Sequence, residues 1–334
     1  MKFTYAYNKE RIQTVKPSMA YDGKDFPAWQ AAAREQLKEL LGLQHFTKVD
    51  PSMEIEYEKD IPGAKEIRFT FATEDGYRVP CHLFLPEGVE NPPVIITLQG
   101  HSTGMHISMG RALFEKDEVS IAGGDRDFCV RALKEGFAAI AMEQRGFGEV
   151  GGKYFGGTGC LETSMTELIM GRTTIGGRVW DLMRLVDLLE AEFSQLVDVN
   201  CICCMGNSGG GTATAYFAAL EDRIKLAMPS SAMASFKDSI GAMRHCACNY
   251  VPKLANFFDM GDLLAMSWPK YYVQVNGVED KIFPIEAARE VFAQGQKAYE
   301  DMGGKDRCVM VEGDGGHRFY ADDAWPLVHN YLGR

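Results

Sequence analysis

Long hydrophobic runs are missing from this chain. Its apolar stretches, such as PPVIITL at residues 92–98, fall far short of the roughly 20 residues that span a bilayer. The first residues, MKFTYAYNKERIQ, also lack the apolar centre of a secretion signal. We therefore expect a cytoplasmic protein that does not bind membranes.

Clustered basic residues are absent as well. The 334 residues include 35 Lys and Arg against 46 Asp and Glu, which gives a net charge of −11. An overall negative field repels phosphate backbones, and binding to them would need a local basic patch. We expect no nucleic-acid partner. The oligomeric state stays open, and a homo-oligomer is compatible with this composition.

The chain also lacks an even number of cysteines, so they cannot all pair in disulfides within it. Nine cysteines, several within strand-like segments, indicate reduced buried thiols rather than a disulfide framework. Cys201 and Cys204 form a C-x-x-C, but zinc would need a second set of ligands, for which HCAC at 245–248 is the only candidate. Strand geometry would instead point Cys201 and Cys203 into a packed layer. We therefore expect no metal site.

Strand-like and helix-like segments alternate through most of the chain. Such alternation predicts a mostly parallel sheet with helices on both faces, an α/β fold. Segments 53–60, 65–72 and 77–86 precede the alternation and predict an antiparallel entry hairpin after a helix at 26–43. The expected later strands are 92–98, 137–144, 199–206, 225–231, 271–277 and 308–314, and the expected helices are 128–136, 178–192, 211–222, 285–301 and 322–333.

This pattern divides the chain into two parts. Residues 1–90 would form the N-terminal helix and entry hairpin, and residues 91–334 the catalytic core. Two segments, 146–177 and 231–268, do not fit the alternation. Insertions after strands tend to carry the binding surface in such folds, so both are expected near the active site.

A serine lies among glycines between an expected strand and an expected helix. Gly206-Asn207-Ser208-Gly209-Gly210 fits G-x-S-x-G in the strand–turn–helix context that a nucleophile elbow requires. Larger flanking residues would collide with the strand and the helix. We predict that Ser208 is an exposed catalytic nucleophile. A glycine-rich phosphate loop is the alternative, but G-x-x-x-x-G-K-[ST] is absent from the chain.

A serine nucleophile needs a base and an acid that orients it. His317 follows an expected strand in EGDGGHRF and can reach the sheet edge, whereas His245 and His329 lie in the insertion and the closing helix. Asp280 follows the expected strand 271–277 and is the predicted acid. Glu279 and Asp314 remain alternatives to it.

Two backbone N–H groups should bind the developing oxyanion. The residue after the nucleophile, Gly209, is expected to supply one of them. The second should come from the loop after 92–98, which reads Gln99-Gly100-His101-Ser102, and His101 is the candidate. Its imidazole would then line the pocket.

With these motifs the chain resembles the α/β-hydrolase superfamily, specifically bacterial acetyl-xylan-esterase-like and dienelactone-hydrolase-like proteins. The resemblance covers about residues 90–320 and implies acyl hydrolysis through a serine acyl-enzyme, with no metal and no cofactor. The matching segments are LQGH, EQRGFGE, GRTTIGGRVWDLMR, GNSGGG, HCACNYVPKL, GVEDKIFP and GGHRF.

Two departures from the family pattern concern the substrate. Gln99 stands where the deacetylase branch usually has histidine, and Gly209 where it often has a polar residue. We predict a serine carboxylesterase that acts on a small or carbohydrate-linked ester. A peptidase or amidase with the same triad, and a catalytically silent binding protein of this fold, remain the alternatives.

Overall fold

The computed structural model describes residues 2–152 and 156–334. In this part of the chain nine strands form one sheet in the order β1-β2-β3-β5-β4-β6-β7-β8-β9. Strands β1, β2 and β3 are antiparallel, β3 pairs antiparallel with β5, and the strands from β5 to β9 run parallel. The bounds are β1 (Glu54–Ile61), β2 (Ala64–Glu74), β3 (Tyr77–Pro86), β4 (Pro93–Leu98), β5 (Ala138–Met142), β6 (Asp198–Asn207), β7 (Ile224–Ser230), β8 (Tyr271–Gly277) and β9 (Cys308–Gly313).

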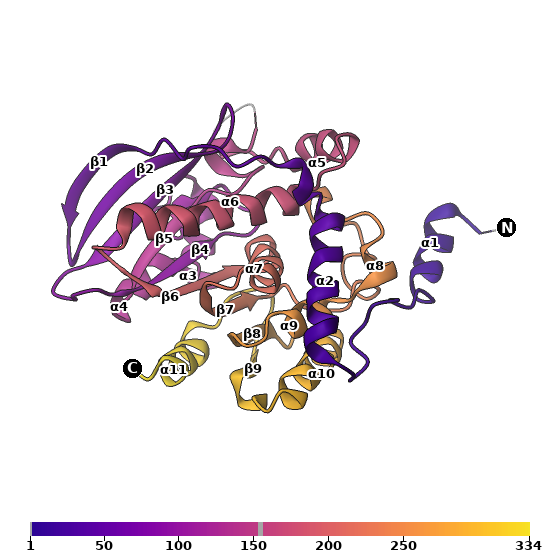
Figure 1. The fold of residues 1–334 in the computed structure, drawn as a ribbon. Helices are drawn as coiled ribbons and strands as arrows, with labels where there is room; N and C mark the ends of the chain where they lie inside the picture. The colour runs from indigo at the N-terminus through magenta and orange to yellow at the C-terminus, as the bar shows by residue number, and fades with distance from the viewer. Residues whose placement is uncertain (1, 153–155) are drawn as a thin grey trace.

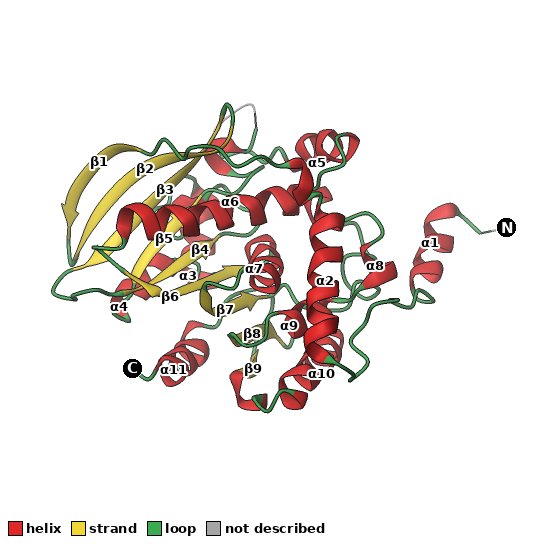
Figure 2. Cartoon of the chain, viewed as in Figure 1, coloured by secondary structure: helices red, strands yellow, loops and turns green. Residues whose placement is uncertain are grey.

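Helices cover both faces of this sheet, which is strongly twisted in the view of Figure 2. Figure 1 shows α6 running along one face, with α2 beside it. The helices are α1 (Thr4–Ile12), α2 (Phe26–Leu41), α3 (Glu115–Gly124), α4 (Phe128–Lys134), α5 (Cys160–Ile169), α6 (Thr174–Leu188), α7 (Gly209–Leu220), α8 (Leu254–Phe257), α9 (Met260–Met266), α10 (Ile285–Asp301) and α11 (Ala321–Leu332).

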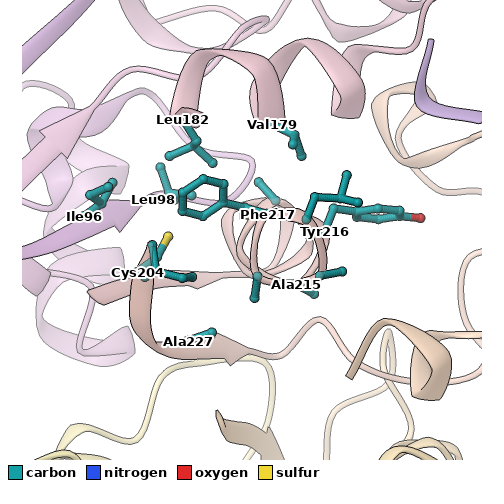
Figure 3. Packing of buried hydrophobic residues seen from close by; sticks show 14 of the residues in the cluster. Ile96, Leu98, Val179, Leu182, Cys204, Ala215, Tyr216, Phe217 and Ala227 are labelled. Carbon is teal, nitrogen blue, oxygen red and sulfur yellow. The ribbon is translucent and has the colours of Figure 1, made fainter. Parts of the chain in front are cut away.

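Successive residues of the central strands enter two separate hydrophobic layers. In β6, Cys204 belongs to a hydrophobic layer that also includes residues of α2, α6, α7, α9 and α10, whereas its neighbour Cys203 belongs to a layer with residues of α4 and α11. Figure 3 shows Phe217 of α7 between Leu182 of α6 and Leu98 of β4 in the first layer. Because every residue of β4 is buried, a continuous apolar run was the right signal for a strand covered on both sides.

The predicted α/β class is confirmed, with a mostly parallel sheet, helices on both faces and an antiparallel start. Strands β1–β3 belong to the same sheet as the later strands, and the division of the chain at residue 90 stays a prediction. Helix α1 was not predicted. It buries none of its residues, so it lacks the apolar periodicity that would have indicated it. No helix in the described ranges is long and apolar enough to cross a membrane.

Candidate active site

Loops from several parallel strands meet at the carboxyl-terminal edge of the sheet. Ser208 follows β6, Asp280 lies three residues after β8, and His317 lies four residues after β9. The loop with Gly100 and His101 follows β4. Because parallel strands end at the same edge, side chains that are distant in sequence come together there.

Ser208 forms the sharp turn between β6 and α7. Its φ is 56° and its ψ is −121°, a conformation that residues with a side chain adopt rarely and at a cost. The Ser208 N–H donates to Ser230 O of β7 at 2.8 Å, and Thr212 Oγ1 donates to Ser208 O at 3.1 Å. These contacts hold the strained turn in place, and the Ser208 side chain stays partly exposed.

Close backbone packing explains the glycines around Ser208. A Cβ at Gly206 would lie 2.5 Å from the Gly210 carbonyl carbon, and a Cβ at Gly210 would lie 2.1 Å from Leu98 O. Both distances are far below van der Waals contact. The strand, the turn and the helix therefore approach one another only because these positions have no side chain.

Gly100 brings the loop after β4 against the serine. A Cβ there would lie 2.7 Å from Asn207 O and 2.8 Å from Ser208 Cβ. The His101 backbone follows directly, so it lies close to Ser208. Gly209 is the first residue of α7, where backbone N–H groups have no partner within the helix. Their role in binding an oxyanion stays a prediction.

Asp280 and His317 form a hydrogen-bonded pair. His317 Nδ1 lies 2.8 Å from Asp280 Oδ2, while Asp280 Oδ1 accepts the N–H groups of Ile282 at 2.8 Å and Phe283 at 3.1 Å. Burial raises the pKa of this carboxyl, but the hydrogen bond and charge of His317 and the two N–H donors outweigh it and lower the pKa. An ionised Asp280 keeps the proton of His317 on Nδ1, so Nε2 is free to accept one. Of the three acids considered, the imidazole contacts Asp280.

The serine turn and the histidine loop are held to the end of β7. Arg318 O accepts hydrogen bonds from Ser230 Oγ at 3.3 Å and from Ser231 Oγ at 3.1 Å. Ser230 also accepts the Ser208 N–H through its carbonyl. Among the described residues no hydrogen bond joins Ser208 Oγ to His317. Such contacts often tighten only when a substrate is bound, so the proton path remains a prediction.

The His101 imidazole packs against Gly209, Phe147 and Cys248. It lies over Gly209, where a Cβ would be 3.0 Å from its Cε1, and it meets the Phe147 ring edge-on at 4.9 Å. Its Nε2 lies 3.2 Å from Cys248 Sγ. Burial lowers the pKa of His101, but hydrogen bonds to Cys246 and Cys248 outweigh this and raise it to about 9.

Sequence reasoning missed the cysteines that surround His101. Cys246 and Cys248 belong to the HCAC segment, but they lie with His101 and Cys160 rather than with the C-x-x-C of β6. In β6, Cys203 is in the core as expected and Cys201 is only half-buried. The HCAC segment indicated a possible ligand set. Its partners, His101 and Cys160, lie in distant loops, so no sequence spacing connects them with it.

Glu143, directly after β5, is a second group whose role the sequence did not indicate. Its buried Oε2 accepts the N–H groups of Met105 and Glu149, each at 3.2 Å. Burial raises the pKa of Glu143 to about 7. The carboxyl group thereby joins the loop after β4 to the turn after β5. Arg145 of the same turn is held by Asp181 through hydrogen bonds of 2.7 and 2.8 Å.

Among the clefts that the described residues form, two include residues near this edge. The larger has a volume of ≈ 710 Å³ and includes His245 in its lining. The His245 ring lies 5.8 Å from the Phe283 ring, and the Phe283 ring stacks on the His317 ring at 6.0 Å. A smaller cleft of ≈ 360 Å³ includes His101. Ser208 is not among the described residues that line either cleft. The larger one is lined by Thr158, Cys160, Leu161, Glu162, Met165, Arg244, His245, Cys246, Ala247 and Tyr250.

The cleft walls come from both predicted insertions. Helix α5 belongs to segment 146–177, and residues 244–250 belong to segment 231–268. Residues 153–155 of the first insertion, which include Tyr154 and Phe155, lie outside the described residues. These two segments therefore line the larger cleft together, and their place at an active site stays a prediction.

Comparisons with known proteins agree with this architecture. No known protein-family profile matches the chain. YtaP of Bacillus subtilis strain 168, provisionally named a hydrolase, is 25% identical over 247 residues, which cover 72% of this chain and 78% of YtaP.

Solved structures cover nearly the whole chain. A provisionally assigned acetyl xylan esterase of Bacteroides fragilis is 15% identical with a TM-score of 0.77, covering 98% of this chain and 84% of its own. A glucuronoyl esterase of Solibacter usitatus is 15% identical with a TM-score of 0.70, covering 96% and 97%. Likeness at this level of identity establishes the α/β-hydrolase fold, and the chemistry must be argued from the site.

Proposed function

We propose that this α/β-hydrolase-fold protein is a serine carboxylesterase with Ser208, His317 and Asp280 as its triad. The observation that carries the proposal is the 2.8 Å hydrogen bond between His317 Nδ1 and Asp280 Oδ2, at the sheet edge where Ser208 forms a strained turn. A buried carboxylate, an imidazole with a free Nε2 and a presented hydroxyl are the three parts that acyl transfer needs.

In the proposed reaction His317 Nε2 takes the hydroxyl proton as Ser208 Oγ attacks the ester carbonyl carbon. The resulting imidazolium is stabilised by the charge of Asp280. His317 then returns the proton to the leaving alcohol as the C–O bond breaks, which leaves an acyl-serine. Water, deprotonated by the same imidazole, attacks the acyl carbon. The bond from this carbon to Ser208 Oγ then breaks as His317 returns the proton to Oγ, which releases the acid and restores the enzyme.

The tetrahedral intermediates carry a negative charge on the former carbonyl oxygen. We assign its stabilisation to the backbone N–H groups of Gly209 and His101, on the two segments that pack around Ser208. Removing one donor of this kind typically lowers turnover by about 10²- to 10³-fold. The first turn of α7 adds the positive end of the helix dipole.

For the substrate we propose a small or carbohydrate-linked ester. The names of the structural neighbours refer to acetyl xylan and glucuronoyl esters. The larger cleft offers hydrogen-bonding side chains (Glu162, Arg244 and His245) and the partly exposed ring of Tyr250. Polar groups around an aromatic face suit the hydroxyls and the apolar face of a sugar.

A substrate panel tests this assignment. We expect turnover of p-nitrophenyl acetate and of acetylated xylo-oligosaccharides, slower turnover of esters with long acyl chains, and labelling of the protein by a fluorophosphonate. Preferential cleavage of aminoacyl anilides would indicate a peptidase or amidase instead. A protein that is not labelled and hydrolyses no ester of the panel would instead be a binding protein of this fold.

Replacing Gly100 by alanine is expected to lower kcat for the best ester by about 100-fold. The added Cβ overlaps Asn207 O and Ser208 Cβ, so the loop or the serine turn must shift by a substantial fraction of an ångström. A misplacement of about 1 Å costs about 10²-fold in rate. Steady-state kinetics with p-nitrophenyl acetate measure the change.

Gly123→Ala is the matched control for Gly100→Ala. No atom lies within 4 Å of a Cβ at Gly123, which belongs to α3. This variant should keep the wild-type kcat. If Gly100→Ala were as active as Gly123→Ala, the loop after β4 would not be packed on the nucleophile as described.

A further inference from the structure

Four side chains with metal-binding atoms meet beside the serine turn. The imidazole of His101 and the thiols of Cys160, Cys246 and Cys248 place one ligand atom each within 4.8 Å of the other three. Cys248 Sγ lies 3.2 Å from His101 Nε2 and 3.4 Å from Cys246 Sγ. Cys160 and Cys248 are buried, and the other two are half-buried.

These ligand atoms come from three separate segments that follow strands of the sheet. His101 lies in the loop after β4, and Cys160 is the first residue of α5. Cys246 and Cys248 lie around the short helix η5 (Ala247–Asn249) in the second insertion. A cluster assembled from three loops at one edge of the sheet would join those loops if one ion bound all four atoms.

The donor set is that of a structural zinc site. Zn²⁺ favours four tetrahedral ligands, and Cys₃His is one of its usual sets. With Zn–S bonds of about 2.3 Å, neighbouring ligand atoms of a tetrahedron lie ~3.8 Å apart. The separations of 3.2 Å and 3.4 Å lie below this value and every pair lies within 4.8 Å, so the four atoms are close enough to bind one ion after small shifts.

A buried arginine provides an independent reason to expect negative charge at this cluster. Arg178 is fully buried, and in the described part of the chain no carboxylate pairs with it. Its Nε and Nη2 donate to the uncharged Arg145 O at 3.0 and 2.8 Å, and its guanidinium lies 4.2 Å from the Phe147 ring. Beyond these neutral partners, Nη1 donates to Cys248 Sγ at 3.5 Å and Nη2 to Cys160 Sγ at 3.7 Å. A buried cation needs a compensating anion.

Thiolates bound to a metal ion would supply the negative charge that Arg178 needs and would not repel one another. Three adjacent thiolates without a cation would repel one another, and three neutral thiols would leave Arg178 without a counter-charge. Zn²⁺ with three thiolates and one neutral imidazole carries a net charge of −1, which the guanidinium balances. Hydrogen bonds from outer groups such as this one commonly orient metal ligands.

We propose that His101, Cys160, Cys246 and Cys248 form a closed four-coordinate Zn²⁺ site. Binding exchanges three thiol protons for one Zn²⁺ and changes no oxidation state. Because the protein supplies all four ligands, no coordination position remains for water or substrate, and the role is structural. The ion would fix the His101 loop, α5 and the second insertion relative to one another.

Metal content gives the direct test, which does not depend on the proposed esterase activity. Protein purified under reducing conditions without chelator should contain about one Zn²⁺ per chain by mass spectrometry. Metal-free protein should take up one equivalent in competition with a chromophoric chelator, with a Kd of about 50 nM or tighter. The double variant Cys246→Ser/Cys248→Ser should lose this uptake. Cys201→Ser, a half-buried cysteine outside the cluster, should retain it.

Co²⁺ and thiol titration keep the test decisive if the double variant does not fold. Wild-type protein titrated with Co²⁺ should develop thiolate-to-metal charge-transfer absorption and the intense visible bands of tetrahedral cobalt. Denatured, metal-free protein should show all nine thiols. Seven thiols would reveal a disulfide in place of the site. That result, a wild type without stoichiometric uptake, or a folded double variant that binds like wild type would overturn the proposal.

Discussion

Replacing Ser208 by alanine is expected to lower kcat for the best ester by on the order of 10⁵-fold or more. Triad residues act as a unit, and loss of the nucleophile leaves only the contribution of substrate binding and oxyanion stabilisation. Alanine tolerates the turn no better than serine, but the N–H contact to Ser230 O does not depend on the side chain. Initial rates with p-nitrophenyl acetate and fluorophosphonate labelling, followed by peptide mapping, measure the effect.

Ser194→Ala is the matched control for this substitution. Ser194 follows η4 (Leu189–Phe193) just before β6, at the amino-terminal edge of the sheet, and it should keep the wild-type rate and labelling. If Ser208→Ala retained full activity, or if the phosphonate labelled another residue, the assignment of the nucleophile would be wrong. The α/β-hydrolase fold would stand regardless.

The elbow could be predicted from sequence because its determinants are local. Ser208 and its glycines lie within five residues. A Cβ at Gly206 would meet the backbone of Gly210, and a Cβ at Gly210 would meet the backbone of Leu98 in the neighbouring strand β4. Asp280 and His317 were also identifiable, since each follows a strand whose apolar pattern is clear. Their direct contact required only that parallel strands end at one edge.

The cysteine cluster could not be predicted because its determinants are distant in sequence. Cys160 and Cys248 are separated by two helices, two strands and a long insertion, and His101 lies before all of them. Sequence spacing suggested C-x-x-C as the partner of HCAC, but that motif lies on a strand whose alternation sends Cys203 and Cys204 to opposite faces. The packing of loops brings the four side chains together, and loop packing leaves no periodic pattern in the sequence.

The same site links both proposals through His101. Its backbone is assigned to the oxyanion hole, and its imidazole to the zinc site. Catalysis by the triad needs no metal ion, whereas the position of the loop that carries the His101 N–H would depend on one. Loss of zinc should therefore lower kcat without preventing phosphonate labelling of Ser208.

Replacing Asp280 by asparagine is expected to lower kcat by about 10⁴-fold while leaving KM within a few fold. Asp280 Oδ1 accepts two backbone N–H groups, so the amide oxygen must take that position. The amide NH₂ then faces His317 Nδ1 and donates to it. The imidazole proton is forced onto Nε2, which can no longer accept the proton of Ser208.

Asp314→Asn provides the control, because Asp314 lies in the same loop as His317 without contacting it through a described hydrogen bond. It should reduce kcat by less than about threefold. Equal effects of the two substitutions would mean that loss of negative charge, rather than the tautomer of His317, controls the rate.

The pH dependence of the free energy of unfolding measures how much the ionisation of Asp280 contributes to stability. Because the folded protein lowers the pKa of this carboxyl, its ionisation contributes stability that is fully present above the unfolded pKa of about 3.9 and is lost as the pH falls through the folded value. Asp280→Asn should therefore unfold at lower urea than wild type at pH 6, and the gap should narrow toward pH 3. A gap that stayed constant across this range would show that the folded protein does not lower the pKa of Asp280, which would contradict the hydrogen bonds described for this carboxyl.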